Sequence, residues 1–202
     1  MSLLRKTLIT LCGLALFAAI AWGVFVAADR MAQDLASSRI RGLSLTDAAG
    51  TTWRVADLGH KIGILYFGYT FCPDVCPTAM NTLALALEKL GPARGAFQPV
   101  FVSVDPARDT PKALKEYLAH FDETILGVSG SEDEVKAFSH AFGVTYFISR
   151  QKNEGDAYLI DHTAGFFLVT AEGEHVPLPI TNDPSELRDI FLRSRDRLSP
   201  AE

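Results

Sequence analysis

The sequence has 202 residues, of which 48% are hydrophobic and 21% are charged, and this balance excludes an intrinsically disordered chain. Its formal net charge of -5, with lysines and arginines scattered along the chain, excludes a basic surface for nucleic acid. We therefore expect one hydrophobic core, a short additional segment and no nucleic-acid partner.

Residues 7–28 contain no charged side chain and predict a membrane-spanning helix. A helix of this length would extend roughly 33 Å, about the hydrocarbon thickness of a bilayer. Arg5 and Lys6 precede the run, so the N-terminus is expected in the cytoplasm and the rest of the chain across the membrane. A cleaved signal peptide ending at Val26-Ala27-Ala28 is the alternative, although its apolar core would exceed the usual ~7 to 15 residues.

Three segments follow from this pattern. We expect residues 1–28 to form a cytoplasmic tip and a single-pass membrane anchor, residues 29–41 a polar stalk, and residues 42–202 a folded domain. The short N-terminus lacks an Arg- and Ser-rich transit segment. This favours the bacterial inner membrane, with the folded domain in the periplasm.

Strands and helices alternate within the expected domain. Residues 42–58 predict a β-hairpin. Thr110 is expected to cap one helix, and Ser131 with Glu134 forms a capping box for another. Apolar runs and helical spacing predict further strands at 63–67, 99–104, 125–128, 145–149, 157–160, 165–170 and 175–178, and helices at 78–90, 110–121, 131–143 and 184–197. This order describes an α/β, thioredoxin-like domain with added β-hairpins.

Cys72 and Cys76 are the most informative residues of this domain. They follow the buried strand predicted at 63–67 and enter the next helix, and α/β folds expose reactive groups at this end of a strand. In a first helical turn, two thiols four residues apart face the same side, so both could reach one metal ion or each other. Outside the cytoplasm an oxidising environment would join them, and a reductant would be needed to free them.

The cysteine pair departs from thioredoxin-type redox enzymes in two ways. Three residues separate the cysteines, where such enzymes have two. No proline occurs between Pro111 and Pro177, so the strand at 165–170 lacks the proline that such enzymes place before it. Where that proline would approach the sulfurs, this chain has Asp161-His162.

Cys72, Cys76 and His162 together predict a copper site. Two thiolates and one imidazole form a soft set of three donors, which suits Cu(I) and also accepts Cu(II). Zinc normally takes a fourth protein ligand or a water, and the sequence offers no obvious fourth sulfur or histidine nearby. Asp161 is expected beside the site, where it would fix the tautomer of His162 or hold a loop.

Three motifs, in this order along the chain, resemble the Sco/SenC family. They are Gly-Tyr-Thr-Phe-Cys-Pro-Asp-Val-Cys-Pro at 68–77, Val-Ser-Val-Asp-Pro-Ala-Arg-Asp-Thr-Pro at 102–111 and Asp-His-Thr at 161–163. The resemblance covers residues 42–197. Members of this family are membrane-anchored, thioredoxin-like copper chaperones that help to assemble the binuclear copper site of cytochrome c oxidase.

The resemblance implies copper binding by Cys72, Cys76 and His162, and Asp161 matches the acidic residue that precedes the family's histidine. It implies the copper-bearing subunit of cytochrome c oxidase as the recipient, with other copper chaperones and a thioredoxin-like reductant as further partners. Phe71 stands where many members have His or another polar residue. This departure bears on partner choice rather than on copper binding.

Other functions remain open from the residues alone. A thiol-disulfide oxidoreductase using Cys72 and Cys76 would keep the cysteines of an oxidase subunit reduced, and a thiolate at a helix N-terminus supports it. A peroxidase or redox sensor is a third class found on this fold, and a structural disulfide is the simplest alternative. Asp105 and Asp109 are interpreted as turn and helix-start residues rather than a hard-metal or phosphate site. A chaperone would need no bond-making catalysis and would not be an enzyme.

Overall fold

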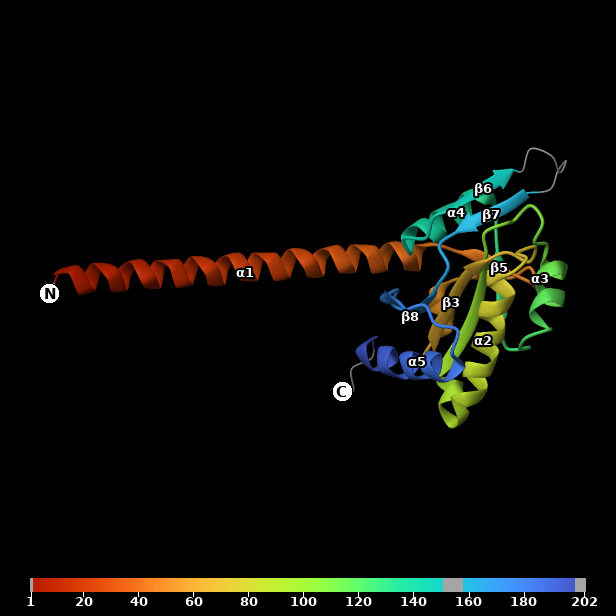
Figure 1. The fold of residues 1–202 in the computed structure, drawn as a ribbon. Helices are drawn as coiled ribbons and strands as arrows, with labels where there is room; N and C mark the ends of the chain where they lie inside the picture. The colour runs from red at the N-terminus through yellow and green to blue at the C-terminus, as the bar shows by residue number, and fades with distance from the viewer. Residues whose placement is uncertain (1, 151–157, 199–202) are drawn as a thin grey trace. The chain divides into compact units, whose positions relative to one another are not determined.

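The computed structural model describes residues 2–150 and 158–198. Helix α1 (Ser2–Gly42) includes the run at 7–28 that the sequence predicts as a membrane-spanning helix (Figure 1). Within the described ranges it is the one helix that is long and apolar enough to cross a bilayer. The chain divides into two compact units between Ala36 and Ser37, so the last turn of α1 belongs to the second unit.

The second unit is built on a seven-stranded mixed sheet. Its strands are β1 (Leu45–Asp47), β2 (Thr52–Trp53), β3 (Ile62–Gly68), β4 (Phe97–Ser103), β5 (Leu126–Ser129), β8 (Phe166–Val169) and β9 (His175–Pro177). They lie in the order β2-β1-β5-β4-β3-β8-β9. Strands β3, β4 and β5 are parallel, whereas the flanking pairs are antiparallel. The predicted α/β class is thus confirmed, including the N-terminal hairpin.

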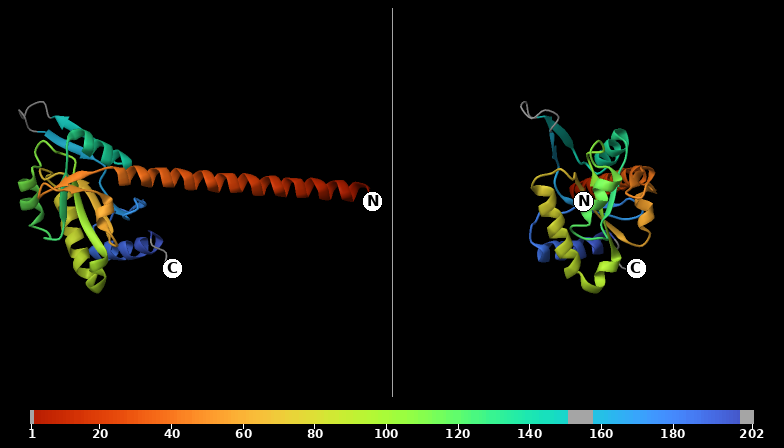
Figure 2. Two further views of the ribbon diagram at one scale, coloured as in Figure 1. Left: turned by 180° about the vertical axis from the view of Figure 1, so that it is seen from behind. Right: turned by 90° about the vertical axis from the view of Figure 1, so that its right-hand side faces the viewer.

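Helices alternate with strands along the chain. They are α2 (Val75–Lys89), α3 (Pro111–Leu118), α4 (Glu132–Ala141) and α5 (Pro184–Leu198), with 3-10 segments η1 (Val55–Leu58) and η2 (Gly91–Ala96). Helices α2 and α5 lie side by side (Figure 2), α3 contacts β5, and α4 contacts β1. Thr110 caps α3 as predicted, because its Oγ1 accepts the Ala113 N–H at 3.2 Å.

Strands β6 (Tyr146–Arg150) and β7 (Tyr158–His162) form a separate two-stranded antiparallel sheet, in which Tyr146 lies opposite His162. This is the second added hairpin predicted from the sequence. Residue 157, which was predicted to begin β7, lies outside the described residues. The strand continues to His162, beyond the predicted end at residue 160, so the candidate ligand is its last residue.

The hydrophobic core centres on β3, which is buried from Ile62 to Gly68. A strand covered on both faces reads as a continuous apolar run, and this is the pattern that the sequence has there. Ile40, in the last turn of α1, is also fully buried in this core. Gly173 forms the β8–β9 turn with a φ of 86°, and a Cβ there would collide with the backbone of Ser37. The end of α1 is therefore packed into the domain.

The capping box predicted at the start of α4 is present. Ser131 Oγ accepts the Glu134 N–H at 3.3 Å, and the Glu134 carboxylate accepts the Ser131 N–H at 2.8 Å. The hydrogen bonds from the Ser131 backbone and hydroxyl lower the pKa of Glu134. A carboxyl group whose pKa is lower in the folded state stabilises the fold above its unfolded pKa, and this contribution is lost as the pH falls through the folded pKa.

We expect Ser131→Ala to reduce the free energy of unfolding by about 1 kcal/mol at neutral pH, because an N-cap acceptor is lost. The difference from the parent should shrink as the pH falls through the lowered pKa of Glu134, because the carboxylate is then protonated. Urea unfolding of the detergent-solubilised protein at neutral pH and below that pKa measures it. A difference that grows on acidification would contradict a stabilising bond between Ser131 and the ionised Glu134 carboxylate.

Candidate metal centre

The two cysteines lie in different secondary structure. Cys72 lies in the loop after β3, where its N–H donates to the Tyr69 carbonyl at 3.3 Å, and Cys76 lies in the first turn of α2, which begins at Val75. The expectation that both lie in one helical turn is wrong for Cys72. The reason is Pro73, because a residue that precedes a proline is disfavoured in helical conformation.

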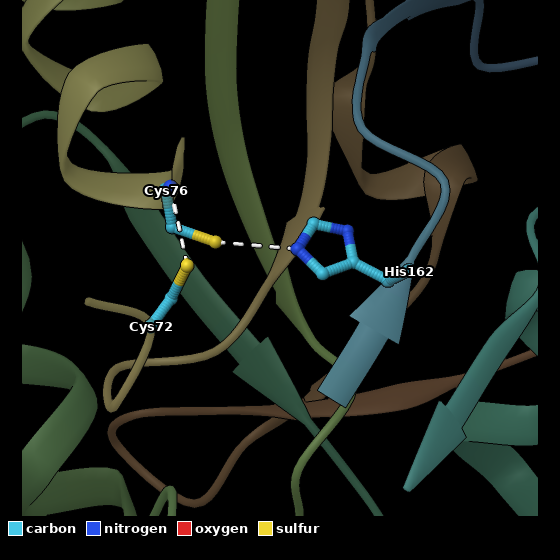
Figure 3. A group of neighbouring side chains, drawn as sticks. All are labelled: Cys72, Cys76 and His162. Atoms are coloured by element: carbon cyan, nitrogen blue, oxygen red, sulfur yellow. Dashed lines mark hydrogen bonds between the residues drawn. The ribbon is translucent and has the colours of Figure 1, made fainter. Parts of the chain in front are cut away.

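The sulfur of Cys72 nevertheless contacts the start of the helix. Cys76 N–H donates to Cys72 Sγ at 3.4 Å (Figure 3). The first amides of a helix have no partner within the helix, so the sulfur satisfies one of them in the manner of an N-cap. The N-cap residue Asp74 makes no such bond with its side chain. The loop and the helix start therefore hold both thiols in one place.

His162 enters the site from β7, far along the chain. Its Nε2 lies 3.4 Å from Cys76 Sγ, and the ring points at the two thiols (Figure 3). Nδ1 lies 3.2 Å from the Thr163 carbonyl oxygen. An N–H at Nδ1 bonded to that carbonyl leaves the Nε2 lone pair facing the sulfurs. The three residues singled out in the sequence are thus brought together.

Asp161 does not contact the imidazole in the way that was predicted. Successive residues of a strand point to opposite faces, and Asp161 is exposed while Ile160 is buried and His162 half-buried. The ring takes its Nδ1 contact from the Thr163 carbonyl instead. Because β7 continues through His162, the acidic side chain beside it faces away from the thiols.

The two thiols are buried rather than exposed at the surface of the domain. Cys76 is fully buried and Cys72 is only 8% exposed, whereas His162 is half-buried. The half-buried imidazole therefore forms the solvent side of the group. Cys76 lies behind it in the core, and Phe71 next to Cys72 is 59% exposed.

The two thiols have opposite protonation tendencies. Cys72 accepts a hydrogen bond from the Cys76 thiol, and with smaller contributions from backbone N–H groups this lowers the pKa of Cys72. The same bond to Cys72, together with burial, raises the pKa of Cys76. The metal-free pair therefore holds one proton near neutral pH, with the thiolate on Cys72.

Two tyrosines hold the imidazole ring. The rings of Tyr66 and Tyr69 lie edge-on to His162, with centroids 6.3 and 6.0 Å away. The Tyr69 hydroxyl also accepts the Ile160 N–H at 3.2 Å, which ties β7 to the loop of Cys72. Tyr69 belongs to the motif at 68–77, but the sequence predicts no role for it, since a contact across 91 residues leaves no local pattern.

Gly68 is a second residue that sequence reasoning missed. A Cβ at this position would lie 2.9 Å from both Cys76 Sγ and Tyr66 Cε1. Real side-chain carbons do not approach other atoms this closely, so any larger residue would displace the thiol or the ring. The close approach of backbone to sulfur explains why a glycine ends β3.

Asp109 and Asp105 have structural partners, and those of the Asp109 carboxylate lie outside the turn and helix start that the sequence predicts. The Asp109 carboxylate accepts the Thr70 hydroxyl and the Ser103 hydroxyl, each at 2.6 Å, and the Thr70 N–H at 3.1 Å. Asp105 forms an ion pair with Arg108. Asp109 thereby joins the loop of Cys72 to the end of β4.

The donor geometry fits a single soft ion. One ligand atom from each of Cys72, Cys76 and His162 lies within 4.8 Å of the others. Sulfur and nitrogen donors at about 2.0 to 2.3 Å from a shared metal lie roughly 4 Å apart. Small side-chain movements would therefore bring all three onto one ion, and two sulfurs with one nitrogen favour copper among biological metals.

Comparison with known proteins assigns the family. A family model described as SCO1/SenC matches residues 32–189. The chain belongs to the SCO1/SenC family. The SCO2-like protein of Rickettsia conorii is 34% identical over 151 residues, which are 74% of this chain and 73% of that protein.

Two solved SCO1/SenC structures resemble the fold. The crystal structure of Arabidopsis thaliana ScoI with copper bound has a TM-score of 0.70 at 33% identity, and covers 77% of this chain and 96% of that chain. The crystal structure of yeast Sco1 with copper bound has a TM-score of 0.70 at 36% identity, and covers 79% of this chain and 89% of that chain. The predicted thioredoxin-like fold and the predicted family are confirmed.

The protonation of the pair predicts how this SCO1/SenC protein reacts with alkylating agents. In the reduced, metal-free protein, iodoacetamide should modify Cys72 before Cys76, at a rate nearly independent of pH from about 6 to 8. Below its pKa of about 8.5, an ordinary thiol instead reacts about tenfold faster for each unit by which the pH rises, because the thiolate fraction increases. Mass spectrometry of the quenched protein measures the rate at each cysteine.

Cys76→Ala is the matched control for this prediction. It removes the thiol that donates to Cys72, so the rate at Cys72 should regain the steep dependence on pH. If the parent protein already shows that steep dependence, the thiolate is not held on Cys72.

Proposed function

We propose that this protein is a copper chaperone that carries one copper ion on Cys72, Cys76 and His162. The observation that supports this most strongly is the convergence of two sulfurs and one imidazole nitrogen within 4.8 Å. This donor set suits Cu(I) and also accepts Cu(II). The resemblance to ScoI and Sco1 structures with copper bound supports the same metal.

Transfer of copper requires only exchange of ligands. Three protein donors leave room for a fourth, and the half-buried His162 lies on the accessible side of the buried sulfurs. A thiolate or imidazole from a partner can attach to the ion before the imidazole leaves it. No covalent bond of a substrate is made or broken, so the proposed role is that of a carrier rather than an enzyme.

The proposed recipient is the copper-bearing subunit of cytochrome c oxidase, which the family resemblance implies. Other copper chaperones would supply the ion, and a thioredoxin-like reductant would keep Cys72 and Cys76 as thiols. Oxidation of the pair to a disulfide would remove both sulfur donors from the metal. Reduction must therefore precede loading in an oxidising compartment.

Helix α1 supports attachment to a membrane. We propose that residues 1–28 are the cytoplasmic tip and the anchor, that residues 29–41 are the stalk, whose last turn from Ser37 packs into the domain, and that residues 42–202 are the copper-binding domain. Arg5 and Lys6 before the apolar run favour a cytoplasmic N-terminus. Together with the bacterial relatives, this supports a single-pass protein of a bacterial inner membrane with its domain in the periplasm.

A thiol-disulfide oxidoreductase is the second candidate. It is favoured by one observation: Cys72 and Cys76 are both free, and Cys72 Sγ accepts the Cys76 N–H at the start of α2, a position that favours a thiolate. A thiolate attacks disulfides of other proteins, and the neighbouring thiol would then resolve the mixed disulfide. This chemistry does not require His162 as a metal ligand, so a His162 variant separates the two functions.

We expect the reduced protein to bind one copper ion per chain. His162→Ala should weaken copper binding by more than about 100-fold. Loss of a residue that only hydrogen-bonds to a metal ligand already weakens affinity by about 10- to 100-fold, and loss of the ligand itself should weaken it more. Competition with a chromophoric Cu(I) chelator measures the dissociation constant.

His120→Ala is the matched control, since His120 is exposed and its side chain hydrogen-bonds only with the Tyr117 carbonyl among the described residues. It should bind copper like the parent. The Cys72–Cys76 disulfide should form in both variants. If His162→Ala binds copper as tightly as the parent, the carrier proposal fails. Turnover of a disulfide substrate by the His162 variant would then favour the oxidoreductase.

A further inference from the structure

His162 lies on β7, a strand that does not pair with the seven-stranded sheet. Strands β6 and β7 pair only with each other in the described part of the chain. A two-stranded hairpin is marginally stable by itself in water. The position of the imidazole relative to the thiols therefore depends on contacts that attach β7 to the rest of the domain.

Three alternate residues of β7 make these contacts. Tyr158, Ile160 and His162 share one face of the strand, and the exposed residues between them share the other. His162 faces the thiols, and Ile160 is buried with its N–H bonded to the Tyr69 hydroxyl. Tyr158, at the far end of the strand, is held by Arg108 and Asp105.

Arg108 contacts both halves of the site. Its Nη1 donates to the Tyr158 carbonyl at 2.9 Å, and its guanidinium stacks on the Tyr158 ring at 3.6 Å. The same guanidinium lies 4.8 Å from the ring of Phe71 and 5.7 Å from that of Tyr69, in the loop of Cys72. Asp105 completes the clamp, pairing with Arg108 and accepting the Tyr158 hydroxyl at 2.6 Å.

The loop that carries Arg108 is itself fixed to the cysteine loop. Asp109, in the same loop, accepts the N–H and the hydroxyl of Thr70, which precedes Cys72 by two residues. The Asp105 carboxylate is almost fully buried, so it cannot shift without breaking its pair. Residues 105–109 thus contact both the strand of His162 and the loop of Cys72.

We propose that Arg108 is a positioning residue that holds His162 within bonding distance of the two thiols by clamping Tyr158. This inference rests on the proposed copper-carrying function. A planar guanidinium can stack on Tyr158, pair with Asp105 and donate to a carbonyl at once, whereas an ammonium at the same place cannot. The clamp orients β7, and β7 delivers the imidazole.

Arg108→Lys keeps the charge and removes the planar fork. It should weaken copper binding by about 10- to 100-fold, the range seen when an outer partner of a metal ligand is lost. In the Cu(II)-loaded protein, the nitrogen hyperfine splitting from His162 should weaken or disappear from the electron paramagnetic resonance spectrum. The rate of disulfide formation between the cysteines should not change.

Arg94→Lys is the matched control. Arg94 forms two hydrogen bonds with Asp122, at 2.7 and 2.8 Å, and this pair makes no contact with the metal centre. The variant should bind copper and give the same spectrum as the parent. Tyr158→Phe keeps the stacked ring and loses the bond to Asp105, so it replaces Arg108→Lys if that variant does not fold.

A double-mutant cycle separates positioning from general stability. If Arg108 acts through His162, adding Arg108→Lys to His162→Ala should leave the dissociation constant for copper unchanged. If Arg108→Lys weakens copper binding as much in the His162→Ala variant as in the parent, the inference fails while the copper-carrying function stands. The same conclusion follows if Arg108→Lys alone binds copper as tightly as the parent. If His162→Ala alone binds copper like the parent, the proposed function fails and the inference fails with it.

Discussion

The contact between Cys76 Sγ and His162 Nε2 joins two parts of the molecule that hydrogen bonding in the main sheet does not connect. The sulfur is fixed by the core, because β3 leads into α2 and Gly68 lets the thiol pack against the strand. The imidazole is fixed only as firmly as the β6–β7 hairpin. The tyrosines around the ring and the loop of residues 105–109 therefore determine whether three donors meet.

The three donors differ in burial, and this difference gives them different roles. Cys76 lies in the core and keeps its proton in the metal-free pair, whereas Cys72 holds the thiolate at the start of α2. A metal ion would displace the remaining proton and bind two sulfurs that solvent scarcely reaches. His162 is the donor nearest to solvent, so it is the ligand that an incoming partner can replace first. Firm holding and exchange can coexist because they use different ligands.

Much of the fold and the site could be predicted from the sequence, because strand patterns, the capping box and the motifs around Cys72 and His162 are local or ordered along the chain. Other features depended on details that local patterns do not fix. Pro73 keeps Cys72 out of the helix, and the continuation of β7 through His162 turns Asp161 away from the ring. The contacts of Tyr69 and Arg108 with β7 span 91 and 50 residues, so only the folded chain reveals them.

Extended X-ray absorption at the copper edge of the Cu(I)-loaded protein tests the central claim most directly. We expect about two sulfur neighbours and one nitrogen neighbour, at roughly 2.2 to 2.3 Å and 2.0 Å, with the outer-shell scattering of an imidazole. The imidazole scattering should vanish in His162→Ala. A first shell of sulfur alone, or of nitrogen and oxygen without sulfur, would contradict a site built from Cys72, Cys76 and His162.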